Sequence, residues 1–278
     1  MVSNRLSAHI GYLFNQLPLE SRIEAAAKAG FTAVEHPQPF VVEARQMREV
    51  LRRHDLVFSQ IAAAVGDAGK GEKGLAALPG READFREEFK RSLGYALEIG
   101  CPLIHPMAGV PEGGPGDAAT ETYRRNIDFA VESTASVPVK VLIEAISHAA
   151  VPGYFMSSIE AAVAVQDIFG PGNVSLLVDT FHAAATDFDV VPWISENSYR
   201  IGHVHIADHP GRHEPGTGRF PFKDFLTALQ TEGYEDAIGF EYIPTATTEA
   251  GLAFLQSWKS GQWETDSQPF LNKERGFR

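Results

Sequence analysis

The sequence predicts an α/β fold, a single closed (β/α)₈ barrel in which eight parallel strands are each followed by a helix. Eight short apolar runs without helical period alternate with longer segments of helical pattern. These units occupy about 260 residues, which is the usual size of such a barrel. A doubly wound open sheet is the structural alternative, but it would more often carry a glycine fingerprint after its first strand.

The domain organisation is expected to be simple. No linker divides the chain, and no internal repeat stronger than the strand–helix period is visible. We therefore expect one barrel domain over residues 1–260. The last segment, 261–278, is polar and irregular, which predicts a tail outside the barrel.

The expected strands are short runs rich in β-branched and other apolar residues. They cover residues 5–10, 31–36, 56–63, 101–107, 139–146, 173–180, 200–208 and 236–243. The third strand is followed by a glycine-rich segment, "GDAGKGEKGLAALPG". This segment departs from the phosphate-binding pattern G-x-x-x-x-G-K-[ST], because Glu72 stands where the lysine should be. We expect a mobile active-site loop instead, with Arg81 as a candidate for the start of the next helix.

The expected helices carry terminal signals at several places. Pro18 opens the first helix and Gly30 stops it. Ser157, followed three residues later by Glu160, has the pattern of a capping box for the helix after the fifth strand. The helices are expected at residues 18–30, 42–55, 81–100 and 117–135, from 157 onward, and at 191–198, 221–233 and 247–260.

Charge and cysteine content exclude several classes of partner. The formal net charge of −12 argues against nucleic-acid or anionic-membrane binding, because both need concentrated Lys and Arg. No apolar run is long enough to span a bilayer, and the N-terminus lacks the features of a signal peptide. The single cysteine, Cys101, suits a reducing compartment, and its apolar neighbours predict a packed thiol rather than a nucleophile. We expect a cytoplasmic protein.

Four successive strands carry potential ligands at their ends. Glu144 ends the fifth strand and Asp179 the sixth, while His205 and Glu241 lie in the seventh and eighth. Each gap is about one strand–helix unit long. Because the carboxyl ends of all strands in a parallel barrel meet at one face, we expect these four side chains at the same height on adjacent strands.

These four residues together predict a metal site. Three crowded carboxylates would repel one another unless a cation lay between them, and buried ionised carboxylates are costly unless paired or metal-bound. Three carboxylates and one imidazole suit a divalent metal of intermediate hardness. Mn²⁺ or Mg²⁺, with Co²⁺ as a further candidate, fits better than a structural zinc. Taken singly, each residue would be an ordinary salt-bridged or core residue.

Other polar residues are expected to line the same mouth. His182, just beyond the sixth strand, would point over the metal toward whatever binds there. Arg212 has a guanidinium that suits the oxygens of a polyol or a carboxylate, although an exposed arginine in a polar loop is the alternative. His9, His36 and His105 end the first, second and fourth strands, where each is either a pocket residue or a structural one.

Several segments are recognisable together: "GEKGLAALPGRE", "LIEAISHAAVPGYF", "VDTFHA", "IGHVHIAD", "GRHEPGTG", "GFEYIPT" and "TTEAGL". With them the chain resembles the hydroxypyruvate isomerase family, within the xylose isomerase-like TIM barrels, over nearly its whole length. "HEPGTG" and "GEKGLAALPGRE" are specific, whereas "DTFH" is shared with ketose 3-epimerases. The resemblance implies a metal held by Glu144, Asp179, Glu241 and the residue at position 205. It also implies that Glu144 and Glu241 are the catalytic acid/base pair, and that His182 and Arg212 contact substrate.

Three residues depart from the pattern of this family. His205 stands where the isomerases usually carry Gln, and an imidazole there is typical of the epimerase relatives. Ile243 replaces the lysine of the usual "EYKP", which removes a cation that would help to hold a substrate carboxylate. His36 stands where an aromatic or apolar residue is more common. These departures bear on the substrate rather than on the fold or the metal site.

The chemistry expected of such a site is proton transfer next to a carbonyl group. A metal bound to adjacent carbonyl and hydroxyl oxygens would stabilise the enediolate that forms. One glutamate would remove the proton and the other would return it, to the neighbouring carbon in an isomerase or to the opposite face in an epimerase. We expect a keto-acid or sugar isomerase, acting on hydroxypyruvate, which would give tartronate semialdehyde, or on 2-oxo-tetronate.

Three other functions stay open. A ketose 3-epimerase is the nearest, favoured by His205 and by Ile243 in place of lysine. A phosphodiesterase or apurinic endonuclease on a related barrel would need several metals and a basic groove, which the net charge of −12 disfavours. A non-catalytic sugar-binding barrel is disfavoured by the two retained glutamates. Barrels of this kind often form homo-oligomers, but the sequence does not indicate a number of subunits.

Overall fold

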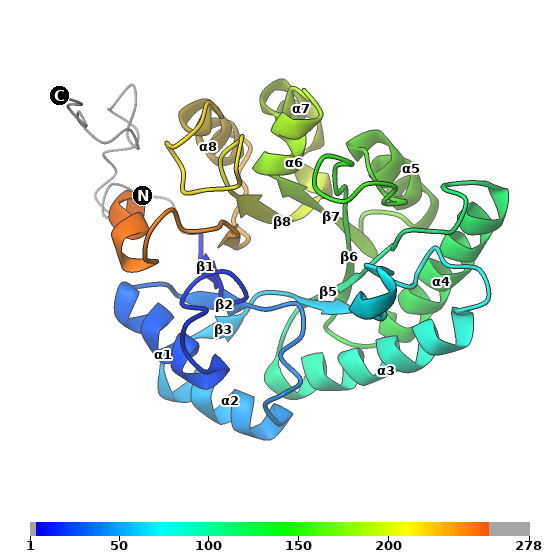
Figure 1. Cartoon of the computed structure of the whole chain (residues 1–278), viewed down its shortest axis with the longest axis horizontal. Coiled ribbons are helices and arrows are strands. Elements are labelled where there is room, and N and C mark those ends of the chain that lie inside the picture. Colours follow the sequence, from blue (N-terminus) through cyan, green and yellow to red (C-terminus); the bar gives the residue numbers. More distant parts are fainter. Residues whose placement is uncertain (1–3, 256–278) are drawn as a thin grey trace.

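The computed structural model describes residues 4–255 and shows a barrel of parallel strands surrounded by helices (Figure 1). The strands follow one another in the order β3-β2-β1-β9-β8-β7-β6-β5-β4, and each pair of neighbours is parallel. The predicted (β/α)₈ barrel is therefore confirmed. The strands are β1 (Leu6–His9), β2 (Ala33–Glu35), β3 (Val57–Phe58), β4 (Ile61–Ala63), β5 (Leu103–Pro106), β6 (Lys140–Glu144), β7 (Val174–Asp179), β8 (Ile201–Ile206) and β9 (Ile238–Phe240).

The third expected strand, 56–63, is broken into two pieces. β3 pairs with β2, with Val57 opposite Ala33, and β4 pairs with β5, with Ile61 opposite Ile104. Because of the interruption at residues 59–60, one segment of chain pairs with β2 on one side and with β5 on the other, at the point where the barrel closes. Eight expected strands therefore appear as nine.

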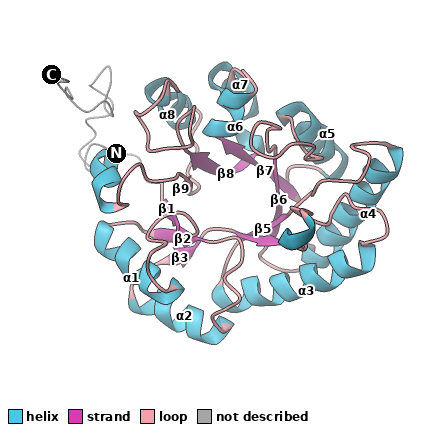
Figure 2. Ribbon diagram, in the orientation of Figure 1, coloured by secondary structure: helices cyan, strands magenta, loops and turns pink. Residues whose placement is uncertain are grey.

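The helices form a ring outside the strands (Figure 2). They are α1 (Leu19–Ala29), α2 (Ala44–Arg53), α3 (Glu82–Ile99), α4 (Asp117–Thr134), α5 (Ile159–Phe169), α6 (Thr180–Ala185), α7 (Val190–Asn197) and α8 (Phe222–Thr231). Short 3-10 segments cover Ala68–Lys70, Ser198–Arg200 and Glu249–Leu252.

Helix α3 shows how the sequence pattern produces this packing. Phe85, Phe89, Leu93 and Ala96 recur at spacings of three and four residues, and all of them are buried against the barrel. The helix ends at Gly100, which adopts a left-handed conformation with φ of 72° that other residues rarely accept. Sequence period and terminal signal thus agree with the observed element.

The structure corrects three details of the predicted helices. Helix α5 is capped by Ser158 rather than Ser157, because the Ser158 hydroxyl oxygen accepts the Ala161 N–H at 3.2 Å. Helix α6 was not predicted. The described part of the predicted closing helix, 247–260, begins as the 3-10 segment at 249–252, and the predicted tail, 261–278, lies outside the described residues.

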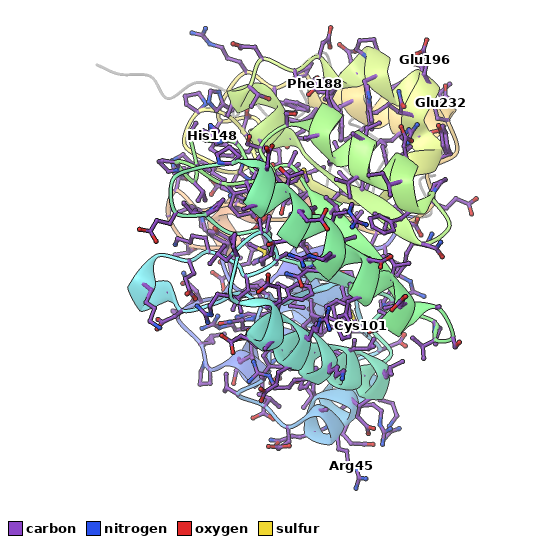
Figure 3. The ribbon with its side chains drawn as sticks, turned by 90° about the vertical axis from the view of Figure 1, so that its right-hand side faces the viewer. Arg45, Cys101, His148, Phe188, Glu196 and Glu232 are labelled. Carbon is purple, nitrogen blue, oxygen red and sulfur yellow. The ribbon has the colours of Figure 1, made fainter. Side chains whose placement is uncertain are left out.

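The thiol of Cys101 is packed as predicted. Figure 3, a side view, shows Cys101 within the body of the protein, whereas Arg45 projects outward from α2. Cys101 is 1% exposed, and burial raises its pKa to about 12, so the thiolate is disfavoured. Within residues 4–255, no helix combines the length and apolar character that a membrane span requires.

Candidate active site

The four strand-end residues singled out from the sequence come together at the carboxyl end of the barrel. Glu144 ends β6, Asp179 ends β7, His205 lies in β8 and Glu241 directly follows β9, and these strands are neighbours. In the strand register, Asp179 lies opposite His205. One ligand atom from each residue lies within 4.8 Å of the others. Three of the side chains are buried, and that of Glu241 is 12% exposed.

Asp179 divides its two carboxylate oxygens between the fold and the cluster. Oδ1 accepts the backbone N–H groups of Phe181 at 2.7 Å and His182 at 3.2 Å, and so caps helix α6. Oδ2 faces the other members of the cluster and lies 3.9 Å from Nδ1 of His205. The helix cap therefore fixes the direction in which this carboxylate points.

The two glutamates of the cluster differ in proton affinity. Burial raises the pKa of Glu144 to about 8, and the nearby charge of Glu241 adds to the shift. Burial also opposes ionisation of Glu241, but Arg212, His205 and His9 outweigh it and hold the pKa of that carboxyl well below its usual range. Two carboxylates whose surroundings drive their pKa values apart can supply an acid and a base.

The chemistry of these donors fits a divalent cation. Among the described residues, Oε1 of Glu144 and Nδ1 of His205 are buried without a hydrogen-bond partner. Nδ1 of His205 nevertheless lies 2.7 Å from Oε2 of Glu241, so two acceptors would face each other unless a proton or a cation came between them. Three carboxylates and one imidazole suit Mg²⁺, Mn²⁺ or Co²⁺. Glu144, Asp179, His205 and Glu241 are the residues that would hold it.

Arg212 lies directly at this cluster. Its Nη2 donates to Oδ2 of Asp179 at 3.0 Å and to Oε2 of Glu241 at 2.6 Å. Its guanidinium lies over the rings of Tyr12, at 5.5 Å from the ring centroid, and Phe181, at 5.3 Å. These two cation–π contacts favour this position of the charged group. The alternative of an exposed arginine in a polar loop is excluded.

The loop that carries Arg212 is organised by Asp208. One oxygen of this buried carboxylate accepts the backbone N–H groups of Gly216 at 2.9 Å and Gly218 at 2.8 Å. The other accepts the N–H of Phe220 at 3.2 Å. Asp208, which follows the histidines of the seventh predicted strand, therefore holds the loop rather than the cluster.

His182 lies at the cluster in a defined tautomer. The backbone N–H of Ser147 donates to its Nδ1 at 3.3 Å, so Nδ1 is an acceptor and the ring proton lies on Nε2. Nε2 lies 3.8 Å from Oε1 of Glu144. Burial lowers the pKa of His182, which favours the neutral ring. A neutral imidazole with its N–H directed at the cluster can donate to a bound oxygen atom.

Two of the other predicted histidines, His9 and His105, flank the cluster. Nε2 of His9 lies 3.4 Å from Oε1 of Glu241, and Nδ1 of His105 lies 3.6 Å from Oε2 of Glu144. Burial lowers the pKa of both, to about 3 for His105. His36 is half-buried, and its Nδ1 accepts the N–H of Gln38 at 3.0 Å.

Sequence reasoning missed a buried carboxylate beneath the cluster. Glu35 ends β2, is 0% exposed and lies 2.7 Å from Nε2 of His203 and 3.3 Å from Nε2 of His205. The available signal was a glutamate that ends the strand segment "TAVEH", the same kind of signal that identified Asp179. Its partners follow about 170 residues later, so no local pattern connects them.

The glycine-rich loop after the third expected strand is tied to the barrel. Gly74 forms an antiparallel bridge with Ala108, and a Cβ at Gly74 would lie 2.4 Å from the carbonyl oxygen of Met107. Arg81 stands directly before α3, as expected, and pairs with Glu72. The mobility expected of this loop stays a prediction.

Comparisons with known proteins agree with this architecture. The model of the xylose isomerase-like TIM barrel family matches residues 23–258. The chain is 38% identical to the 2-oxo-tetronate isomerase of Cupriavidus necator, over 91% of this chain and 98% of that protein. It is 30% identical to the hydroxypyruvate isomerase of Escherichia coli, over 92% of this chain and 99% of that one.

Solved structures show the same fold. A crystal structure described as an AP endonuclease, family 2, from Brucella melitensis superimposes with a TM-score of 0.87 at 34% identity, covering 92% of this chain and 99% of that one. The D-psicose 3-epimerase of Clostridium cellulolyticum superimposes with a TM-score of 0.72, covering 95% and 96% of the two chains, but its 16% identity shows the fold alone. The chain therefore belongs to the hydroxypyruvate isomerase family of xylose isomerase-like TIM barrels.

Proposed function

We propose that this chain is a metal-dependent isomerase of short 2-keto acids that carry a hydroxyl group on the adjacent carbon, with hydroxypyruvate and 2-oxo-tetronate as the candidate substrates. The observation that carries the proposal is the cluster of Glu144, Asp179, His205 and Glu241, which combines ligands for a divalent cation with two glutamates of different proton affinity. The relatives named above support the substrate class.

The proposed reaction moves one proton between neighbouring carbons. With hydroxypyruvate, Glu241 takes a proton from C3, because its cationic neighbours keep it ionised. The electron pair left behind forms an enediolate across C2 and C3. Glu144, the second glutamate of the cluster, delivers a proton to C2 while the hydroxyl proton passes from O3 to O2, which gives tartronate semialdehyde, and proton exchange with solvent then restores both carboxyl groups. In the reverse direction the two glutamates exchange roles.

The surrounding side chains would bind and orient the substrate. His182 presents Nε2–H toward the cluster, which suits hydrogen bonding to a carbonyl or hydroxyl oxygen. Arg212, held between two rings, would direct its remaining donors at substrate oxygens. His9 and His105 complete the polar wall. A divalent cation, when bound, would polarise the carbonyl and stabilise the negative charge that develops as the proton leaves.

A ketose 3-epimerase is the second candidate. The same pair of glutamates would serve if the proton returned to the opposite face of the carbon that lost it. Ile243 favours the epimerase, because its apolar side chain, which is 46% exposed, offers no positive charge to a substrate carboxylate. Ile243 lies beside the Arg212 loop, and its backbone N–H donates to the Arg212 carbonyl oxygen at 2.7 Å. An epimerase substrate would be a neutral ketose.

The two candidates are separated by proton NMR in D₂O. The protein is treated with EDTA, loaded with Mg²⁺ and offered hydroxypyruvate, 2-oxo-tetronate and a panel of free ketoses, with Glu241→Gln as the matched control. We expect deuterium to enter C3 of hydroxypyruvate as tartronate semialdehyde forms, or the equivalent exchange in 2-oxo-tetronate. Exchange confined to C3 of a ketose, with inversion, would overturn the isomerase in favour of the epimerase. Turnover that persists without metal would contradict metal dependence.

A further inference from the structure

A buried ionisable triad lies directly beneath the candidate metal cluster. Glu35 on β2 faces His203 and His205 on β8, and the two strands are not neighbours but are separated by β1 and β9, so the contact passes through the barrel interior (Figure 1). Glu35 and His203 are 0% exposed, and His205 is 2% exposed. A carboxylate taken so completely out of water is costly unless its surroundings supply compensating hydrogen bonds.

The hydrogen bonds that compensate for the burial of Glu35 come chiefly from the two imidazoles. Oε2 of Glu35 lies 2.7 Å from Nε2 of His203 and 3.3 Å from Nε2 of His205, and the Ser59 hydroxyl lies 3.2 Å away. An ionised carboxylate only accepts hydrogen bonds, so both Nε2 atoms must carry a proton. The other nitrogen of His205, Nδ1, then faces the upper cluster, 2.7 Å from Oε2 of Glu241.

The available space keeps the triad in this arrangement. Gly239 on β9 lies opposite His205 in the strand register. A Cβ at this position would lie 2.2 Å from Oε1 of Glu35, 2.8 Å from Cδ2 of His205 and 2.9 Å from Nε2 of His203. Any larger residue at position 239 would collide with the triad. Gly239 therefore has a steric role: it leaves room for the three side chains.

We infer that Glu35 is a positioning residue for the metal site: it holds the proton of His205 on Nε2 and so presents Nδ1 as the ligand atom. The inference rests on the proposed function, because it requires that His205 binds the metal. Metal-ligating histidines commonly donate their second N–H to a carboxylate, and loss of such a partner lowers metal affinity about 10- to 100-fold. His203 shares the same carboxylate and helps to hold it under His205.

The first test is the affinity of the EDTA-treated full chain for Mn²⁺, measured by isothermal titration calorimetry. Glu35→Gln keeps the size of the side chain but replaces the charged acceptor of both Nε2–H groups by a neutral amide, which is a weaker acceptor and no longer favours the proton on Nε2 of His205. We expect the variant to bind Mn²⁺ about 10- to 100-fold more weakly than the wild type. Ser59→Ala is the matched control: it removes the third donor to Glu35 without touching either ring, and it should weaken Mn²⁺ binding less than Glu35→Gln does.

The second test needs no variant and follows the ring directly. Nitrogen-15 NMR of the Mg²⁺-loaded wild type, with histidines labelled, should show His205 protonated on Nε2 and not on Nδ1. A proton on Nδ1 would overturn the inference. Equal Mn²⁺ affinities of the wild type and a folded Glu35→Gln would also overturn it. The same holds if the wild type binds two equivalents of Mn²⁺ and Glu35→Gln binds only one, because Glu35 would then be a metal ligand itself. A wild type that binds no Mn²⁺ would instead contradict the proposed metal dependence.

Discussion

Arg212 donates a hydrogen bond of 2.6 Å to Glu241, from Nη2 to Oε2. The same nitrogen lies 3.0 Å from Asp179, so one cation neutralises two carboxylates of the cluster. This contact is the main reason why the pKa of Glu241 stays low despite burial, whereas burial raises that of Glu144. The difference in pKa between Glu144 and Glu241 is thus due chiefly to Arg212, which follows the seventh of the eight predicted strands.

Arg212→Lys should weaken substrate binding while leaving much of the turnover. Lysine keeps the positive charge but loses the planar group held between Tyr12 and Phe181, so we expect KM to rise about tenfold. Arg212→Ala should in addition raise the pKa of Glu241, which would shift the acidic limb of the kcat/KM profile to higher pH. Profiles of the two variants that coincide would contradict this assignment.

Glu144→Gln and Glu241→Gln should each reduce kcat by about 10²- to 10⁴-fold, because an amide cannot exchange a proton with carbon. Rates are measured by NMR at saturating Mg²⁺, with bound metal determined separately, so that lost chemistry is distinguished from lost metal. Glu98→Gln, on the outer helix α3, serves as the control and should keep the wild-type rate. If Glu241→Gln binds metal and retains a near-wild-type rate, the acid/base pair is wrongly assigned.

Metal binding should depend on pH through His205 and through Glu144, because both ligands hold a proton near neutral pH in the metal-free protein. Although burial acts against its charge, Glu241 and Glu35 raise the pKa of His205 well above 6.5, so at neutral pH a metal must displace the proton on Nδ1. We expect the affinity for Mn²⁺ to fall as pH is lowered, by about tenfold per pH unit for each proton displaced. Calorimetry at pH 7 in buffers of different ionisation enthalpy should detect at least one released proton. An affinity that is constant between pH 6 and 8 would argue against His205 as a ligand.

Glu144 should contribute a loss of stability to the metal-free protein as pH rises. Its folded-state pKa of about 8 lies above the ordinary value of 4.5, so the folded protein holds a proton that the unfolded chain releases in this window. This contribution to the free energy of unfolding should therefore fall between these pH values, on the order of 1 kcal/mol per pH unit. Glu144→Gln lacks this contribution, and urea unfolding in EDTA at pH 5 and pH 8 measures the difference. A gap between variant and wild type that does not widen with pH would contradict the burial of a titrating Glu144.

Addition of metal should reverse this loss. A ligand that binds only the folded state at 100 times its Kd stabilises it by about 2.7 kcal/mol. We expect Mn²⁺ to raise the unfolding midpoint of the wild type and to raise that of Asp179→Asn much less, as thermal unfolding with and without EDTA would show. Equal stabilisation of both proteins would place the ion elsewhere.

The position of the upper cluster could be predicted from the sequence because one rule governs it. Parallel strands end at one face, so Glu144, Asp179 and His205 follow from strand ends alone once the barrel is assumed. The break at residues 59–60 could not be predicted in the same way, since the segment looks like one strand until its two neighbours are known. Helix α6 has six residues, too few for a clear period.

The lower triad escaped prediction for a different reason. Glu35 is recognisable as a carboxylate at a strand end, but its role depends on His203 and His205, which come from β8, a strand that is distant in sequence and separated from β2 by β1 and β9. The sequence also does not specify hydrogen-bond direction. That His182 presents Nε2 follows only from its contact with the backbone of Ser147.

The proposed metal site places one divalent cation among Glu144, Asp179, His205 and Glu241, between the two proton-transferring carboxylates. The most direct measurement is anomalous diffraction from crystals of the Mn²⁺-loaded protein, recorded at the manganese edge. We expect one anomalous peak within bonding distance of Nδ1 of His205 and of oxygens from the three carboxylates. No peak at this position, or a peak among Glu35, His203 and Nε2 of His205 instead, would contradict it.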